Sequence, residues 1–498
     1  MSDRWAALEA LPDTSLVDLF ANDAERVGHF GAVLPGLQFD FSKTHLTGEA
    51  LAALAALADT AGLDAARKRL FAGEIVNPTE GRAATHSAER GEGDAETVHV
   101  SRMLHDRMRA LIDAIEMGAL GEIRHILHIG IGGSALGPDL LVDALGRDAG
   151  RYEVAIVSNV DGSALADVFS RFDPHYTLVS VASKSFTTTE TLINAHSTLD
   201  WLEQAAVEDP LGRFVALTAN PEKAVEWGID ETRILPFAES VGGRYSLWSS
   251  IGFPAALALG WEAFDALLEG AAQMDRHFRL TDWRENVCFL GAAVDLYYTQ
   301  KRRCETRAVF AYDERLRLLP SYLQQLEMES NGKSVTADGN PLNYPSAAIT
   351  WGGIGTDAQH AVFQLLHQGT HLVPVEFLAS KTPGSDLDPV HHRTLLINCF
   401  AQGAALMTGK ANPGDPARAY PGDRPSTTIL LDDVDPRSVG ALIAFYEHRT
   451  FVNAVLLGIN PFDQFGVELG KEIARSIESE GTDSFDPSTQ ALIVAAFD

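Results

Sequence analysis

The sequence predicts an α/β protein with two tandem domains, each an α/β sandwich built on a parallel-rich sheet flanked by helices. Three observations indicate this class. The chain has 498 residues, which is too many for a single hydrophobic core. Short apolar runs of strand length alternate with segments of helical periodicity. This alternation occurs twice, once in each half of the chain, so two sheets are expected.

The first half begins with a helical segment. Apolar residues recur at helical spacing over residues 51–63 and 103–117, so the first 120 or so residues are expected to be mostly helix. Four strands are then expected, with helical patterns between them, at residues 125–129, 154–157, 178–182 and 213–217. Strands separated by helices form parallel sheets, because a parallel pair needs a long crossover connection.

The second half repeats the pattern. The β-prone runs are 308–312, 347–351, 372–377 and 452–459, and residues 395–407 read as one of the helices between them. The boundary between the halves is expected in the helical region 261–282. We therefore predict a helical segment at 1–100 that packs on the second domain, a first domain at 101–265, a second domain at 266–478 and an arm at 479–498.

Composition narrows the class of protein. Asp and Glu number 68 against 39 Lys and Arg, a formal charge of −29, which disfavours binding to nucleic acid or to anionic membranes. No apolar run approaches the length of a membrane span, and the first residues lack the basic stretch and apolar core of a secretory signal. The three cysteines match neither a disulfide framework nor a thiolate metal site. A cytoplasmic location is expected.

A glycine turn follows the first predicted strand. Gly130-Ile131-Gly132-Gly133-Ser134-Ala135 leads into a helical pattern, which points backbone N–H groups at an anion. Gly133 and Ser134 are therefore candidate binding residues. The string also satisfies a dinucleotide-binding pattern, and a purely structural tight turn is a third interpretation. The dinucleotide interpretation is weakened because the second strand ends in Ser158 and Asn159, where an acidic residue is wanted.

A cluster of hydroxyl groups follows the third predicted strand. The string Ser183-Lys184-Ser185-Phe186-Thr187-Thr188-Thr189-Glu190 precedes a helical pattern. Capping the helix needs one hydroxyl, whereas a phosphate group needs several donors. We therefore predict a phosphate site formed by hydroxyl groups of this string, with Lys184 adding a positive charge, and an elaborate helix cap is the alternative. No Walker-type string is present, so the phosphate is expected to belong to a substrate.

A candidate base lies near the end of a predicted helix. An apolar face is followed by Asn331-Gly332, a suitable helix stop, so Gln325 and Glu329 lie one turn apart on one face. A carboxylate held there could take up and release a proton. The alternative for Glu329 is an ordinary solvated glutamate.

Three further residues are candidates for the chemistry. His360 is expected in the first turn of a helix that begins near Gly355, where the positive helix end favours a neutral imidazole. Arg244 follows two glycines and could stabilise a developing negative charge. Lys471 is expected on the apolar side of a helix, partly buried, although Glu468 offers an ordinary ion pair. Structural roles are the alternative for each.

Together these strings resemble the glucose-6-phosphate isomerase family over about residues 39–471. The resemblance is carried by residues 77–83, 130–138, 182–191, 239–252, 322–333, 355–370 and 446–471. It implies two sugar-isomerase (SIS) type domains. It also implies reversible aldose–ketose isomerisation of D-glucose 6-phosphate and D-fructose 6-phosphate through ring opening and a cis-enediol, in glycolysis and gluconeogenesis, with no metal or other cofactor.

The resemblance also implies a role for each site residue. His360, helped by Lys471, would open the sugar ring, Glu329 would carry the proton, and Arg244 would stabilise the enediolate. Ser134, Ser183, Lys184, Ser185 and Thr188 match the residues that hold the phosphate. Gln325 and Gln464 would line the pocket and Glu190 would orient the histidine. A homodimer is implied, in which each subunit's histidine completes the partner's site.

Four departures from the family pattern are Ser185 for Thr, Glu327 for Asp, Pro461 for Ser and Phe465 for Trp. Three alternatives stay open. A metal-assisted hydride shift needs a carboxylate and histidine cluster, and His391 and His392 have no carboxylate pairing in sequence. A non-catalytic sugar-phosphate sensor would keep the hydroxyls and lose the base. An isomerase that also accepts mannose 6-phosphate depends on the shape of the pocket.

Overall fold

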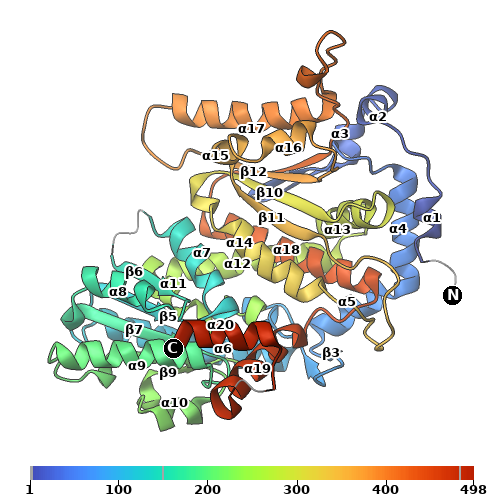
Figure 1. Cartoon of the computed structure of the whole chain (residues 1–498). Coiled ribbons are helices and arrows are strands. Elements are labelled where there is room, and N and C mark those ends of the chain that lie inside the picture. The colour runs from blue at the N-terminus through green and yellow to red at the C-terminus, as the bar shows by residue number, and fades with distance from the viewer. Residues whose placement is uncertain (1–3, 148–150, 482–483, 498) are drawn as a thin grey trace. The chain divides into compact units, whose positions relative to one another are not determined.

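The structure is a computed structural model that describes residues 4–147, 151–481 and 484–497. The chain divides into two compact units, Met1–Pro461 and Phe462–Asp498. Within the described residues the first unit holds a five-stranded, a six-stranded and a two-stranded sheet, and Figure 1 shows helices packed around the two larger ones. The predicted domain boundaries at residues 100, 265 and 478 stay a prediction. Among the described helices, none has both the length and the apolar character needed to span a membrane.

The first sheet, as far as the chain is described, has five parallel strands in the order β6-β5-β7-β8-β9. They are β5 (His125–Ile129), β6 (Glu153–Val157), β7 (Thr177–Ala182), β8 (Phe214–Thr218) and β9 (Ile234–Pro236). The connecting helices are α7 (Leu136–Leu145), α8 (Gly162–Arg171), α9 (Thr189–Gln204) and α10 (Pro221–Trp227). Every residue of β7 is buried, as expected for a central strand covered on both faces. The four predicted strands are confirmed, and β9 was missed.

The second sheet has six strands within the described ranges, in the order β1-β2-β13-β12-β10-β11. Four are parallel: β10 (Thr306–Tyr312), β11 (Ile349–Ile354), β12 (Val375–Ser380) and β13 (Ser426–Leu431). The hairpin of β1 (Gly31–Leu34) and β2 (Leu37–Asp40) pairs antiparallel with β13. The N-terminal segment thus adds two strands to this sheet, whereas the sequence predicted a mostly helical segment and no strand there.

One predicted strand is wrong. Residues 452–459 lie mostly in the helix α18 (Pro436–Leu457), which Asp435 caps through Ser438 N and which ends at Gly458 in the left-handed region. Almost all of α18 is buried, so apolar residues occur on all its sides and the usual helical periodicity is lost.

Helices α18 and α12 (Trp261–Leu280) pack against each other near the middle of the first unit in Figure 1. Glycines allow their backbones to approach closely. A Cβ atom on Gly440 would lie 2.0 Å from the carbonyl oxygen of Leu267, and one on Gly270 would lie 2.0 Å from that of Arg437. The expected boundary region 261–282 is thus the helix that packs on α18.

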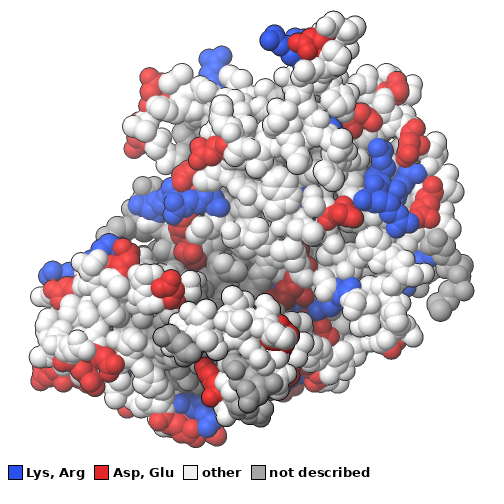
Figure 2. Space-filling model, viewed as in Figure 1, with Lys and Arg blue, Asp and Glu red and all other residues white. Residues whose placement is uncertain are grey.

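The remaining elements of the first unit cover its sheets and edges. They are α1 (Ala6–Glu9), α2 (Leu16–Asn22), α3 (Arg26–His29), α4 (Gly48–Ala61), α5 (Leu63–Phe71), β3 (Ile75–Asn77), β4 (Arg82–Ala83), α6 (Ala95–Glu116), α11 (Phe253–Leu259), α13 (Val287–Leu296), α14 (Leu319–Leu323), α15 (Gly355–Gln359), α16 (Phe363–Gln368) and α17 (Val390–Thr408). Figure 2 shows acidic and basic side chains in small groups scattered over the visible face.

The second unit contains two helices in its described part, α19 (Glu468–Glu480) and α20 (Pro487–Phe497). Large apolar side chains of both helices are exposed, among them Leu469 at 63% and Leu492 at 67%. Exposed apolar side chains on neighbouring helices are typical of a surface that packs on another surface.

Candidate active site

The glycine turn is packed directly against the loop that carries Arg244. Gly132 has a φ of +58°, in the left-handed region that favours glycine. A Cβ atom on Gly133 would lie 2.2 Å from the carbonyl carbon of Gly243 and 2.6 Å from the backbone nitrogen of Arg244. Only a residue without a Cβ atom permits this approach, so Gly133 brings two distant parts of the sequence together.

A buried histidine holds the glycine turn in place. His128 Nε2 donates to the backbone oxygen of Ser134 over 2.7 Å, and Nδ1 accepts from Ser180 Oγ over 2.8 Å. Burial lowers the pKa of His128 to about 4, which favours the neutral imidazole that this pattern requires. Sequence reasoning missed His128, although a histidine within an otherwise apolar strand could have indicated a buried hydrogen bond.

The hydroxyl loop between β7 and α9 forms a compact turn. Ser183 Oγ lies 3.0 Å from Thr188 Oγ1, and Ser185 Oγ lies 2.7 Å from Thr187 Oγ1. Phe186 occupies the left-handed region, with a φ of 53°, and its buried ring anchors the turn. Thr188 is the N-cap residue of α9, but its side chain accepts no hydrogen bond from the first turn of that helix. This arrangement favours a ligand site over the elaborate-cap alternative.

Lys184 connects the hydroxyl loop to the segment before Arg244. Its Nζ donates to the carbonyl oxygens of Glu239 over 2.6 Å and of Val241 over 3.2 Å. Burial, followed by the nearby charge of Arg82, lowers the pKa of Lys184 from its usual value. The ammonium group therefore helps to fix the position of the Arg244 loop as well as contributing positive charge.

Gln325 and Glu329 lie on a widened helical turn. Helix α14 ends at Leu323 and continues as a π-helical turn, Gln324–Glu329. The amide nitrogen of Gln325 lies 3.0 Å from the place where Gly132 would carry a Cβ atom, so this side chain reaches the glycine turn. Glu329 Oε2 lies 3.6 Å from Arg244 Nη1. The structure thus brings Gln325, Glu329, Arg244 and the glycine turn together.

The carboxylate of Glu329 is largely buried, and one of its oxygens has no hydrogen bond from the described part of the protein. Its side chain is 20% exposed, and its Oε2 atom is buried and accepts no hydrogen bond in the described structure. Buried polar atoms normally have partners, so an orphaned carboxylate oxygen indicates a place where a substrate or water atom is bound. A carboxylate of this kind can accept a proton from a bound molecule.

Arg244 is held in a fixed orientation beside Glu329. Its Nε donates to Ser330 Oγ over 2.6 Å, and its Nη2 donates to the carbonyl oxygen of Pro461 over 2.5 Å. Tyr245 OH lies 2.9 Å from the same Ser330 Oγ. Nη1 lies 3.6 Å from Glu329 Oε2, so the guanidinium is placed where it could stabilise an oxyanion formed next to the base. Sequence reasoning missed Ser330.

The expected position of His360 is wrong. Helix α15 runs from Gly355 to Gln359 and His360 is its C-cap residue, because the chain turns at residues 361–362 before α16 begins. The histidine therefore lies at the end of a short helix, and the argument from a positive helix end does not apply. Its side chain is exposed. Glu190 lies in the first turn of α9, and no hydrogen bond or ion pair joins it to His360 within the described residues.

Gln464 and Lys471 belong to the second unit, and their predicted roles stay predictions. Gln464 precedes a short 3-10 turn, Phe465–Val467. Lys471 lies in α19, and it is exposed, as are Val467 and Ala474. The described part of this unit does not cover that side of α19, and the expected partial burial of Lys471 stays a prediction. Lys471 forms no ion pair with Glu468 in the part of the chain described.

The described residues contain no group of three or more His, Cys, Asp or Glu side chains arranged to hold a metal ion. His391 and His392 lie in α17, and His392 Nε2 bonds to the backbone oxygen of Lys381 over 3.0 Å. The geometry gives no support to a metal site at these two histidines.

Comparisons with known proteins identify the family. A family model described as phosphoglucose isomerase matches residues 40–493. The glucose-6-phosphate isomerase of Rhizorhabdus wittichii is 71% identical over 492 residues, covering 99% of this chain and 98% of the relative. That of Zymomonas mobilis is 62% identical over 493 residues, covering 99% and 97%. The crystal structure of a glucose-6-phosphate isomerase from Chlamydia trachomatis superimposes with a TM-score of 0.90 at 30% identity, covering 99% of this chain and 98% of that one. This likeness confirms the predicted α/β class, and the chain belongs to the phosphoglucose isomerase family.

Proposed function

We propose that the chain catalyses the reversible isomerisation of D-glucose 6-phosphate and D-fructose 6-phosphate, and that it does so as a cytoplasmic enzyme of glycolysis and gluconeogenesis. The observation that carries the proposal is the sheltered carboxylate of Glu329, whose Oε2 atom has no hydrogen bond and lies 3.6 Å from Arg244 Nη1. Relatives between 60% and 71% identical bear the name of this activity.

The proposed chemistry moves two protons. Glu329 removes the proton from C2 of the open-chain aldose, and the electron pair forms the C1–C2 double bond of a cis-enediolate. The protonated Glu329 then delivers that proton to C1, while the O2 proton leaves and O1 gains one, which yields the ketose. Arg244 offers the N–H groups of its guanidinium to the oxyanion.

Ring opening precedes the proton transfer. Following the family resemblance, we assign to His360 and Lys471 the movement of a proton from O1 to the ring oxygen of the cyclic sugar. Gln325 and Gln464 would line the pocket and Glu190 would orient the histidine. These roles are proposals that rest on matching motifs.

The phosphate group is proposed to bind at the hydroxyl loop and the glycine turn. The hydroxyl pair Ser183 and Thr188, 3.0 Å apart, can donate to a phosphate together with the first backbone N–H groups of α9. Ser185, Lys184, Gly133 and Ser134 complete the proposed set. The chain has a formal charge of −29, which repels an anionic substrate at long range. Local hydroxyl and N–H donors are therefore needed to bind the phosphate dianion.

The route of the proton can be tested in heavy water. Fructose 6-phosphate is converted by chelator-treated protein, and the glucose 6-phosphate formed is examined by NMR. A carboxylate that carries the proton exchanges it with solvent, so deuterium is expected at C2 of the product. Product without deuterium would favour a hydride shift and would contradict the assignment of Glu329. Binding of the sugar phosphates with no conversion would instead indicate a sensor.

We also propose a homodimer in which each site uses His360 of the neighbouring subunit. His360 is exposed at the surface of the first unit, and the helix it ends packs beside α17, which exposes Ile397 and Phe400. Exposed apolar side chains around an exposed candidate catalytic group are typical of an interface.

Mixing two inactive variants tests the shared site. Glu329→Gln and His360→Ala chains are refolded together at equal amounts, so about half of the dimers are expected to be mixed. If sites are shared, one of the two sites in each mixed dimer has both wild-type residues, and about a quarter of wild-type activity returns. If each site lies within one subunit, the mixture stays inactive, which would contradict the proposal.

A further inference from the structure

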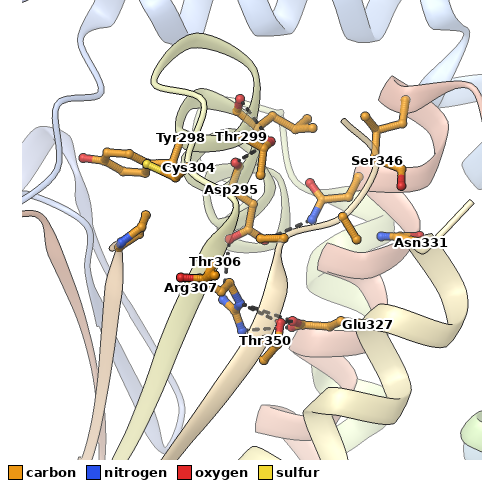
Figure 3. Close-up of a pocket in the computed structure, with 16 residues that line it drawn as sticks. Asp295, Tyr298, Thr299, Cys304, Thr306, Arg307, Glu327, Asn331, Ser346 and Thr350 are labelled. Carbon is orange, nitrogen blue, oxygen red and sulfur yellow. Dashed lines mark hydrogen bonds and ion pairs between the residues drawn. The ribbon is translucent and has the colours of Figure 1, made fainter. Parts of the chain in front are cut away.

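Five charged side chains, four of them buried and Asp295 half-buried, lie beside the π-helical turn that carries Gln325 and Glu329. They come from five different elements: Asp295 on α13, Arg307 on β10, Glu327 in the turn itself, Glu376 on β12 and Arg449 on α18. Figure 3 shows Arg307, Glu327 and Thr350 directed at one another at one end of the pocket drawn there. We call these five residues the ion cluster.

Glu327 is the member of the ion cluster that holds the turn. Its Oε1 accepts from Arg449 Nη2 over 2.6 Å and from Arg307 Nη2 over 3.0 Å. Its Oε2 accepts from Thr350 Oγ1 over 2.7 Å and from Arg307 Nε over 3.2 Å. Burial disfavours the charge on Glu327, but the two guanidinium groups outweigh it and keep the pKa of this carboxyl below its usual value. Glu327 is therefore an ionised carboxylate with both oxygens fixed.

The two arginines also contact the other carboxylates of the ion cluster. Arg449 Nη1 donates to Glu376 Oε2 over 2.8 Å, and Tyr446 OH donates to Glu376 Oε1 over 2.8 Å. Asp295 lies 3.5 Å from Arg307 Nη1 and 3.4 Å from Arg449 Nε. Because β10, β12, α13 and α18 belong to the core of the first unit, Glu327 ties the turn to rigid elements.

The residues after Glu329 are anchored as well. Ser330 Oγ accepts from Arg244 Nε over 2.6 Å, and Asn331 Nδ2 donates to the backbone oxygen of Thr450 over 3.0 Å. Glu329 thus lies between the anchor at Glu327 and the anchors at Ser330 and Asn331, while its own Oε2 accepts no hydrogen bond. The place of its carboxylate is set by its neighbours in the turn.

We propose that Glu327 is a positioning residue for the isomerisation: its contacts with Arg307, Arg449 and Thr350 set where the Glu329 carboxylate lies relative to Arg244. The proposal rests on the proposed function of Glu329. The transfer of a proton between two adjacent carbons requires the base to lie close to both of them. A shift of the base by about 1 Å can lower the rate by about 100-fold. Glu327 acts through Glu329 and does not itself touch the reacting atoms in this account.

The test compares Glu327→Gln with a matched control, Asp275→Asn. Asp275 is also a buried carboxylate, bound by two nitrogens of Arg90 at 2.7 and 2.8 Å and by His448 Nε2 at 2.6 Å, and within the described residues no hydrogen bond or ion pair joins it to the turn. For each purified full-length variant, kcat, KM, the thermal midpoint and the affinity for sorbitol 6-phosphate are measured. Sorbitol 6-phosphate carries the phosphate but no carbonyl group, so it reports binding without chemistry.

Both substitutions are expected to lower the thermal midpoint, since each breaks a buried ion pair. Glu327→Gln should lower kcat by about 10- to 100-fold, with KM and the sorbitol 6-phosphate affinity changed by less than about 3-fold. Asp275→Asn should keep kcat within about 3-fold of the wild type. Wild-type kcat in Glu327→Gln, or an equal loss of kcat in both variants, would overturn the proposal.

Two further measurements keep the test decisive. If Glu327→Gln does not fold, Thr350→Val removes the hydroxyl that donates to Glu327 Oε2 at nearly constant volume, and kcat should fall by about 3- to 10-fold with KM unchanged. Unchanged kcat in that variant would count against the proposal. An inactive wild-type protein would instead refute the proposed function, and the positioning role would fall with it.

Discussion

Gly133 gives the sharpest prediction, because the space that a side chain would need is occupied by backbone. In Gly133→Ala the new Cβ atom would lie 2.2 Å from the carbonyl carbon and oxygen of Gly243 and 2.6 Å from Arg244 N. Non-bonded carbon atoms normally lie about 3.5 Å apart, so the two backbone segments must separate by roughly 1 Å. Backbone atoms cannot rotate away as a flexible side chain can.

In the wild-type structure Arg244 Nη1 lies 3.6 Å from Glu329 Oε2, and the separation is expected to move Arg244 away from Glu329. A misplacement of about 1 Å at a reacting centre costs on the order of 100-fold in rate. We therefore expect kcat/KM for hexose 6-phosphate to fall by about 100-fold in Gly133→Ala. Forcing an extra methyl group into a packed contact should also cost about 1–3 kcal/mol of unfolding free energy.

The assay is steady-state isomerisation together with urea unfolding, and Gly162→Ala is the control. Gly162 is the first residue of α8, and a Cβ atom there meets nothing within 4 Å. The control should keep wild-type activity and stability, or gain up to about 1 kcal/mol from reduced chain entropy. A Gly133→Ala enzyme with wild-type kcat/KM would refute the idea that the glycine turn places Arg244.

Three further predictions follow from the site and its surroundings. Ser183→Ala should raise KM about 10-fold and leave kcat within about 3-fold, because it removes one donor to the phosphate; a fall in kcat at constant KM would contradict the phosphate assignment. His128 has a pKa of about 4 in the folded state, below the ordinary unfolded value, so the unfolded state binds the extra proton between these two values. The stability that His128 contributes is then complete above about pH 6.5 and lost as the pH falls towards 4, by up to about 3 kcal/mol in total. Urea unfolding should give a lower free energy of unfolding at pH 5 than at pH 7, and the difference should be smaller in His128→Gln. An equal difference in the variant would show that other groups cause the loss. Burial raises the pKa of Cys304 to about 11 and that of Cys399 to about 12, so the native protein should react slowly with Ellman's reagent at pH 8 and the unfolded chain should expose three thiols; rapid reaction of the native protein would refute their burial.

The strands of the parallel sheets could be predicted where sequence and burial agree. Residues 125–129 and 308–312 are short apolar runs between helical segments, and both are central strands. Residues 452–459 were wrongly predicted as a strand, because α18 is buried on almost all sides and has no polar face that would reveal a helix. The hairpin β1–β2 was missed because its strands have four residues each, too few for a clear alternation.

The candidate site divides in the same way. The glycine turn, the hydroxyl loop and the helix with Glu329 could be predicted because each is a continuous string whose chemistry is local. The ion cluster could not, because Glu327 pairs with Arg449 across 122 positions and no local pattern marks such a pair. The expected helix start at His360 failed because one apparent helix is broken into α15 and α16.

The central claim is that Glu329 carries the proton. The most direct measurement is the rate at which chelator-treated Glu329→Gln and wild-type proteins convert glucose 6-phosphate to fructose 6-phosphate, followed by NMR. The amide keeps the shape of the side chain and cannot accept the proton, so kcat should fall by about 100- to 10,000-fold while sorbitol 6-phosphate still binds. A Glu329→Gln enzyme that turns over at the wild-type rate would contradict the account.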